Sequence, residues 1–246
     1  MSKKYLLLAR KQKKFEMKLS TSNKIIISDV FKRFKKSILD SNNTKLSQEF
    51  NNQLKIDYMG FEEDLSNALS NMIIKNIDKT ITYYTEIYSW NITKKQILGI
   101  KDTILKNWTK KYAAKKVTKI SETTKNILNK IISDNQGLSG KGLVKEILSK
   151  VDDMSDTRAV TIARTETSSA INNTSLKTAK SAKMKKKRYI HIGGRYTSRD
   201  NHKRLNGKVI GIDEDFDFGT VKAPCPHHPT LPVSEIVNCN CLITFE

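Results

Sequence analysis

Cysteine and histidine side chains that can bind a metal ion gather near the end of the chain. Cys239 and Cys241 are two positions apart, so in an extended segment both thiols project from one face and can reach one ion. Cys225 and His227 repeat this spacing. Because a structural zinc ion takes four nitrogen or sulfur ligands, the pattern predicts one zinc ion. The preferred ligands are His202, Cys225, Cys239 and Cys241, and His227 or His228 can replace one of them.

A second interpretation of the same residues needs no metal. The Cys-x-Cys spacing differs from the Cys-x-x-Cys of zinc ribbons, so it is a weaker zinc signature. The three cysteines would then be small buried apolar side chains, and His227-His228 would lie in a solvated loop. A disulfide within Cys-x-Cys would be strained. The metal-bound and metal-free interpretations both stay open at the level of the sequence.

A catalytic metal site is a third interpretation. Asp200, Asn201 and His202 offer the residue types of an HNH-type nuclease centre. That pattern is short, and no second histidine stands at the expected place. A hydrolytic site also needs an open coordination position and a base, and nothing in the sequence selects one. The sequence therefore favours a protein without enzymatic activity.

Two segments carry dense positive charge. Residues 3–18 contain seven Lys or Arg side chains and one acid, Glu16. Such blocks bind polyanions by releasing counterions, although a single lysine more often belongs to a solvated face. Because no recognition helix is apparent, we expect sequence-independent contact with double-stranded DNA. The second segment has no acid, and its basic residues are Lys177, Lys180, Lys183, Lys185, Lys186, Lys187 and Arg188.

The 246-residue chain divides sharply in composition. All of its His, Cys and Pro residues follow residue 188. Residues 1–188 carry 39 basic and 18 acidic side chains, a net charge of +21, whereas residues 189–246 carry six and seven, a net charge of −1. No apolar run is long enough for a membrane span or a secretory signal, and three cysteines exclude a disulfide scaffold.

Apolar residues at helical spacings predict a mostly helical body. The expected helices cover 27–38, 65–73, 97–108 and 120–132, followed by a break at 135–142, a short helix at 143–151 and a helix from Ser155 to about Met184. Strand-like runs then occupy 188–192, 208–212 and 236–245, with loops between them.

The expected fold class is therefore α+β. A basic, mainly helical region covers 1–154, and a C-terminal module covers 155–246. Within that module, the helix at 155–184 precedes a small mixed part with short strands and loops at 188–246, which contains the Cys and His residues.

Four short motifs follow one another in the C-terminal half. Ala163–Thr167 reads A-R-T-E-T, and Arg199–Gly207 follows the pattern R-x-x-H-x-x-L-N-G. Pro226–Pro229 then reads P-H-H-P, and Asn238–Cys241 reads N-C-N-C. The order and spacing of these motifs, from about Asp156 to Cys241, resemble the phage Mu F-like family of minor head proteins, also called phage head morphogenesis proteins. The chain departs from the family pattern just before Arg195. The family often has an Asp before this Arg, whereas this chain has Gly193-Gly194. The motif residues of this resemblance are Arg164, Thr165, Glu166, Arg199, Leu205, Asn206, Gly207 and Asn238, with His202 completing R-x-x-H-x-x-L-N-G.

The resemblance implies a virion component in the phage head, made in the host cytoplasm, that acts in head morphogenesis or DNA delivery. Its implied partners are portal or inner-capsid proteins, and the positive charge suits contact with packaged DNA. Within the motifs, we expect Arg164 to pair with a carboxylate such as Asp200, and Arg199 to support the site at His202. The alternatives are a zinc-dependent nucleic-acid enzyme or toxin-like effector, and a host nucleoid-type DNA-binding protein.

Overall fold

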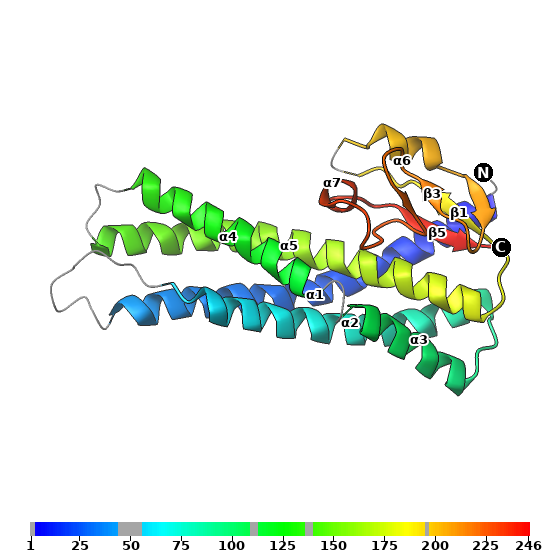
Figure 1. The fold of residues 1–246 in the computed structure, drawn as a ribbon, viewed down its shortest axis with the longest axis horizontal. Coiled ribbons are helices and arrows are strands. Elements are labelled where there is room, and N and C mark those ends of the chain that lie inside the picture. Colours follow the sequence, from blue (N-terminus) through cyan, green and yellow to red (C-terminus); the bar gives the residue numbers. More distant parts are fainter. Residues whose placement is uncertain (1–2, 44–55, 109–112, 136–139, 195–196) are drawn as a thin grey trace.

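The computed structural model describes residues 3–43, 56–108, 113–135, 140–194 and 197–246. Five long helices come first, and a small module of short strands and helices follows (Figure 1). The helices are α1 (Lys3–Asn43), α2 (Tyr58–Tyr88), α3 (Lys94–Asn107), α4 (Ala114–Asp134) and α5 (Gly140–Ser181). The module contains β1 (Lys186–Ile190), α6 (Asp200–Leu205), β2 (Val209–Gly211), β3 (Phe216–Asp217), β4 (Lys222–Ala223), α7 (Val233–Ile236) and β5 (Leu242–Phe245).

The long helices form an elongated bundle in which α1, α2 and α5 run side by side (Figure 1). Their apolar stripes meet in one core, because residues three and four apart share a helix face. This arrangement confirms the helices predicted from the apolar spacings at 27–38, 65–73, 97–108 and 120–132. Fully buried side chains of this core include Ile27, Phe31, Phe34, Ile38, Leu65, Leu69, Met72, Ile77 and Leu128.

Helix α5 differs from the prediction, because it is one continuous helix of 42 residues. The expected short helix at 143–151 and the helix expected to begin at Ser155 are both parts of it, and α5 ends at Ser181 before Met184. The hydroxyl of Ser155 donates to the carbonyl of Asp152 inside the helix and does not cap a new one. The boundary proposed between 154 and 155 therefore falls within α5, and the division into two regions stays a prediction.

The contact between α5 and α1 is lined by small polar side chains. Asn23 of α1 donates to Thr167 of α5 at 2.9 Å and to Asn76 of α2 at 3.1 Å. Ser168 donates to the carboxylate of Glu16 at 2.7 Å. Small side chains let two helices approach closely, and hydrogen bonds offset the cost of burying their polar atoms. Buried polar residues on α5 include Thr165, Thr167, Ser168, Ser169, Asn172, Thr174, Ser175 and Thr178.

The module is built on an antiparallel sheet in the order β2-β1-β5. Lys187 of the central strand β1 pairs with Ile210 of β2 and with Phe245 of β5. The α+β class is confirmed, and each predicted strand is present with shifted or shorter bounds. The structure adds the β3-β4 hairpin and α7 in the segment that the sequence prediction assigned to a loop, and only Ile236 of α7 lies within the expected 236–245 region.

The module packs onto the bundle near the start of α1 and the end of α5 (Figure 1). The hydroxyl of Tyr5 on α1 donates to the carboxylate of Glu246 at 2.8 Å. Phe245 inserts among aromatic rings from the end of α2 and the residues after it: its ring lies 5.9 Å from Tyr88 and 5.7 Å from Trp90. Within the described residues, no helix has the length and apolar character needed to cross a membrane.

Candidate functional site

Three of the predicted zinc ligands meet inside the module. His202, Cys239 and Cys241 each contribute one ligand atom, and these atoms all lie within 4.8 Å of one another. Nδ1 of His202 is 3.5 Å from Sγ of Cys239 and 3.5 Å from Sγ of Cys241. All three residues are buried. The cluster could therefore hold a metal ion, because one imidazole nitrogen and two sulfurs converge at a point closed to solvent.

Two short segments place these side chains. Helix α6 begins after Arg199 and carries His202 in its first turn, while Leu205 packs into the module core. The thiols lie on the loop between α7 and β5, where Asn238 has a left-handed φ of 59° that Asn tolerates better than most residues. After this turn, the backbone N–H of Cys241 donates to Sγ of Cys239 at 3.4 Å.

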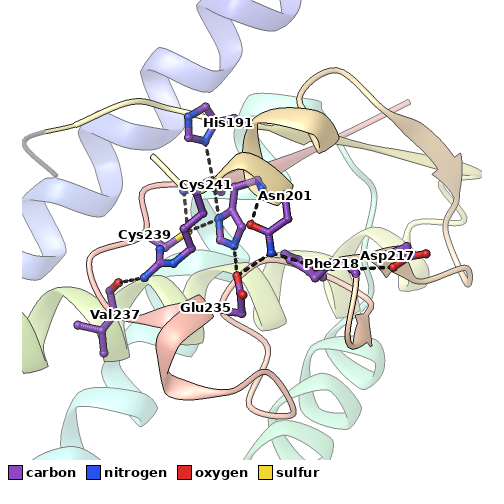
Figure 2. A network of polar contacts seen from close by, with 11 residues as sticks. His191, Asn201, Asp217, Phe218, Glu235, Val237, Cys239 and Cys241 are labelled. Carbon is purple, nitrogen blue, oxygen red and sulfur yellow. Dashed lines mark hydrogen bonds and ion pairs between the residues drawn. The ribbon is translucent and has the colours of Figure 1, made fainter. Parts of the chain in front are cut away.

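A carboxylate fixes the orientation of the His202 ring. Nε2 of His202 lies 2.7 Å from Oε2 of Glu235, and the same oxygen accepts a hydrogen bond from Asn201 at 3.1 Å (Figure 2). Asn201 also donates to the carbonyl of Phe218 at 3.0 Å. With Nε2 held by Glu235, Nδ1 is the nitrogen that faces the sulfurs. Histidine ligands of metal ions commonly have a carboxylate partner of this kind.

The residues of the cluster change one another's ionisation. The hydrogen bond between the two thiols raises the pKa of Cys239 and lowers the pKa of Cys241. Burial lowers the pKa of His202, but its contacts with Cys239 and Glu235 outweigh burial, so the pKa is raised overall. The pair therefore favours one thiolate beside one thiol, and the thiolate is the form that binds metals.

Cys225 lies apart from this cluster, which corrects the ligand set predicted from the sequence. Its side chain is fully buried in the module core, and its thiol is 3.9 Å from Oδ1 of Asn173 on α5. Burial raises the pKa of Cys225 to about 12. It behaves as a small buried apolar residue, because the spacing shared with His227 says nothing about the distance to Cys239.

The other histidines have three different environments. Nδ1 of His228 lies 2.7 Å from the hydroxyl of Thr230, and burial lowers the pKa of His228 to about 4. His227 is buried with a left-handed φ of 57°. His191, absent from the predicted ligands, has Nδ1 3.3 Å from Sγ of Cys241, and these residues face each other in Figure 2. The signal that could have found His191 is the confinement of all four histidines to this module.

The motif residues around His202 hold the surrounding loops. Arg199 donates to the carbonyl of Val237 at 2.8 Å, which supports the turn that precedes the thiols. Asn206 accepts a hydrogen bond from the backbone N–H of His191 at 3.0 Å. Gly207 has a left-handed φ of 82°, and its N–H donates to the carbonyl of Tyr189 at 2.8 Å. The R-x-x-H-x-x-L-N-G motif thus connects α6 to β1 and to the cysteine loop.

The A-R-T-E-T motif lies on α5 within the bundle. Glu166 is buried and forms an ion pair with Lys116 of α4. Thr165 is also buried, and Arg164 is half-buried. The expected pairing of Arg164 with Asp200 is wrong, because Asp200 is exposed and pairs with Lys203 of its own helix at 3.0 Å. This motif therefore stabilises helix packing rather than the attachment of the module.

Replacing Glu166 with Gln should lower the free energy of unfolding by about 1–3 kcal/mol, because Lys116 loses its charged partner in a largely buried position. Urea unfolding followed by circular dichroism measures this loss. The matched control is Glu63→Gln on the exposed face of α2, which should change stability by less than about 0.5 kcal/mol. Equal effects of the two substitutions would show that the Glu166–Lys116 pair does not contribute.

The predicted DNA-binding residues separate into exposed and buried groups. Lys180 pairs with Asp213 at 2.6 Å, and Arg188 pairs with Glu246 at 3.0 Å. Lys187 cannot reach a phosphate in this structure, because its side chain is fully buried. The exposed residues of the segment are Lys177, Lys183, Lys185 and Lys186.

Fold and site together define an α+β protein in which a helical bundle carries a small module with a buried His/Cys cluster. The chain belongs to the family of Phage Mu protein F like proteins, whose model matches residues 108–244, more than half of the chain. This match confirms the resemblance seen in the motifs and extends it to α4.

The chain is also similar to the uncharacterized protein YqbB of Bacillus subtilis (strain 168), with 29% identity over 191 residues. The similarity covers 75% of this chain and 57% of YqbB, so the chain spans a little more than half the length of that relative. No solved structure matches the chain.

Proposed function

We propose that this protein is a phage minor head protein that acts in head morphogenesis as a structural component of the virion. The observation that carries the proposal is the family match over residues 108–244, which includes α4, α5 and the module with its His/Cys cluster. The proposed partners are portal or inner-capsid proteins, and the proposed location is the phage head after synthesis in the host cytoplasm.

The distribution of charge supports a contact with packaged DNA. The guanidinium of Arg188 lies 4.5 Å from the ring of Tyr5, so the basic start of α1 and the basic segment at 177–188 meet at this contact. We propose that exposed basic residues of both segments contribute to one DNA-binding surface around this contact. They include Lys3, Arg10, Lys11 and Lys14 of α1, together with Lys177, Lys183, Lys185 and Lys186. Phosphate contact through such residues is sequence-independent.

The proposed cofactor is one structural zinc ion at the His/Cys cluster, and no enzymatic activity is proposed. A catalytic zinc site keeps a coordination position open to water or substrate. His202, Cys239 and Cys241 are 2%, 4% and 1% exposed, which favours a closed structural site over a zinc-dependent enzyme or toxin-like effector.

Purified particles of the phage that encodes this chain should contain the polypeptide in the head fraction. Heads and tails separated by centrifugation and analysed by mass spectrometry test this expectation. Cross-linking should then join the protein to portal or inner-capsid proteins. Recovery of the chain only with host DNA, and never with heads, would contradict the proposal and favour a host nucleoid-type protein.

Neutralising three exposed lysines beside β1 should weaken DNA binding and its salt dependence. In the Lys183→Gln, Lys185→Gln, Lys186→Gln variant, the slope of log K against log salt concentration should fall by up to about 2.7, or about 0.9 for each lost phosphate contact. Fluorescence anisotropy with duplexes of unrelated sequence measures this slope. The matched control neutralises Lys115, Lys119 and Lys130, which are exposed on α4. An equal change in both variants would contradict a local DNA-binding surface.

A further inference from the structure

The module contains one buried histidine that the polar contacts described so far leave unexplained. His227 is 1% exposed, and neither of its ring nitrogens has a hydrogen-bond partner. Burying a polar group without a partner is unfavourable, so such a residue calls for an explanation. His227 also has a left-handed φ of 57°, a conformation that costs energy in a residue other than glycine.

The ring of His227 lies close to the His/Cys cluster. Its side chain contacts Cys239, but neither ring nitrogen makes a hydrogen bond, and neither belongs to the group of ligand atoms that lie within 4.8 Å of one another. Its backbone position is fixed from the other side, because the carbonyl of His227 accepts a hydrogen bond from Ser169 of α5 at 2.9 Å. A contact with the long helix therefore anchors the backbone of the residue whose ring has no hydrogen-bond partner.

The three clustered residues already have the dimensions of half-formed zinc coordination. Zinc lies about 2.3 Å from a thiolate sulfur and about 2.0–2.1 Å from an imidazole nitrogen, so tetrahedral angles place nitrogen and sulfur about 3.5–3.6 Å apart. In this structure, Nδ1 of His202 is 3.5 Å from each of the two sulfurs. These distances fit ligands that share one tetrahedral ion, and the cluster needs one further ligand to close the tetrahedron.

We propose that His227 is that ligand, so that Nδ1 of His202, Sγ of Cys239, Sγ of Cys241 and a ring nitrogen of His227 bind one zinc ion. This assignment rests on the structural zinc proposed above and replaces Cys225 in the predicted ligand set. It also explains why a histidine without a hydrogen-bond partner is buried in the module. Binding releases the thiol protons, because thiolates are the forms that coordinate zinc.

The surrounding contacts are those that a zinc-bound cluster needs. Glu235 holds Nε2 of His202 at 2.7 Å, and the N–H of Cys241 donates to Sγ of Cys239 at 3.4 Å. Nδ1 of His191 lies 3.3 Å from Sγ of Cys241, while its Nε2 lies 3.0 Å from the hydroxyl of Ser198. His191 is therefore placed to donate a hydrogen bond to a coordinated sulfur rather than to bind the ion.

This coordination joins three segments that lie far apart in the sequence. His202 comes from α6, His227 from the loop after β4, and the cysteines from the loop before β5. Ser169 links the same loop to α5. The module has short strands and little regular structure of its own, so the zinc ion would supply much of the free energy that holds its loops on the bundle.

The test measures zinc in the full-length protein and in three variants, purified under reducing conditions without chelators. The wild type should contain one zinc ion per chain, and cobalt substitution should give the visible absorption of a tetrahedral site with a thiolate-to-cobalt band. His227→Asn is the decisive variant, because Asn tolerates a left-handed φ but lacks the imidazole. Loss of an outer partner alone costs about 10- to 100-fold in metal affinity, so this variant should lose more.

Two controls separate the ligand assignment from general damage to the module. Cys225→Ser should keep one zinc ion per chain and the tetrahedral cobalt spectrum, with helix content unchanged by circular dichroism. His191→Ala should keep the tetrahedral spectrum and lose no more than the roughly 10- to 100-fold in affinity expected for an outer partner. Zinc retained by His227→Asn at unchanged affinity, or lost from Cys225→Ser, would overturn the assignment of His227. Absence of zinc from the wild type would overturn both the ligand set and the proposed cofactor. Neither result would affect detection of the chain in phage heads, which tests the proposed virion role.

Discussion

Replacing Phe245 with Ala should lower the free energy of unfolding by about 3–5 kcal/mol and loosen the module from the helical bundle. Phe245 is 3% exposed, and its ring meets the rings of Tyr84, Tyr88 and Trp90 at centroid distances of 6.3, 5.9 and 5.7 Å. Removing the ring leaves a cavity at the junction between β5 and the end of α2, because the rigid helix cannot collapse into the space.

Urea unfolding followed by tryptophan fluorescence measures this effect, since Trp90 lies at the junction itself. The Phe245→Leu variant keeps most of the buried apolar volume and should lose less than about 1.5 kcal/mol. Limited proteolysis should cut the Ala variant between α5 and β1 faster than the wild type. A loss below about 1 kcal/mol for Phe245→Ala would show that the aromatic cluster does not hold the module.

Replacing Lys187 with Met should stabilise the protein at pH 7 by about 1–3 kcal/mol. The side chain of Lys187 is fully buried on the central strand, and its ammonium has no hydrogen-bond partner. Burial lowers the pKa of Lys187 to about 8, while the neighbouring Cys225 and Asp215 raise it and Lys180 lowers it further. A lowered lysine pKa means that the folded state is destabilised whenever the lysine is protonated.

The stabilisation by Lys187→Met should shrink as the pH rises. An unfolded lysine titrates near pH 10.4, so between about pH 8 and 10.4 the unfolded chain binds more protons at this position than the folded chain. The contribution of Lys187 to stability therefore improves with pH in this window, and below pH 8 its full penalty of about 3 kcal/mol remains. The Met variant lacks this dependence.

Urea unfolding of both proteins at pH 7, 8 and 9 measures the difference between their free energies of unfolding. Titrations that the two proteins share cancel in this difference. Lys186→Met is the control, because Lys186 is the exposed neighbour on the same strand and should change stability by less than about 0.5 kcal/mol. A Lys187→Met variant that is less stable than the wild type at pH 7 would contradict this account. The contact of the Lys187 ammonium with the Phe216 ring, at 5.5 Å, would then outweigh the cost of burial.

The burial of Lys187 shows where local pattern ceases to predict structure. Residues 185–188 are all Lys or Arg, so the sequence indicates a continuous basic segment. In a strand, successive side chains point to opposite faces, so Lys186 is exposed while Lys187 and Tyr189 are buried. Which side of the strand would face the core depended on the partners β2 and β5, and nothing in the local run of charges specifies them.

Helix α5 gives a second example, because its predicted helical structure is confirmed while the burial of its polar residues was not predicted. Apolar spacing predicts helices well where a wide apolar stripe is buried, as in α2. Along the C-terminal half of α5, many of the buried residues are Ser, Thr and Asn, interspersed with apolar residues such as Ile171 and Leu176. Thr167 and Ser168 find hydrogen-bond partners on α1, and Asn172, Ser175 and Thr178 donate within α5, so polar residues at these positions are buried without an apolar signature in the sequence.

The amino-acid sequence by itself determined that the chain is a basic helical body joined to a neutral module, because helical spacing and net charge are local properties. It also determined that the module contains metal-binding residue types within the phage Mu F-like motifs. Only the tertiary structure decided that Cys225 packs away from the cluster, that His191 lies beside it, and that His227 is buried without a hydrogen-bond partner. Distances between side chains on separate segments arise from the packing of α6, the loops and α5 together, and residue spacing along the chain carries no information about them.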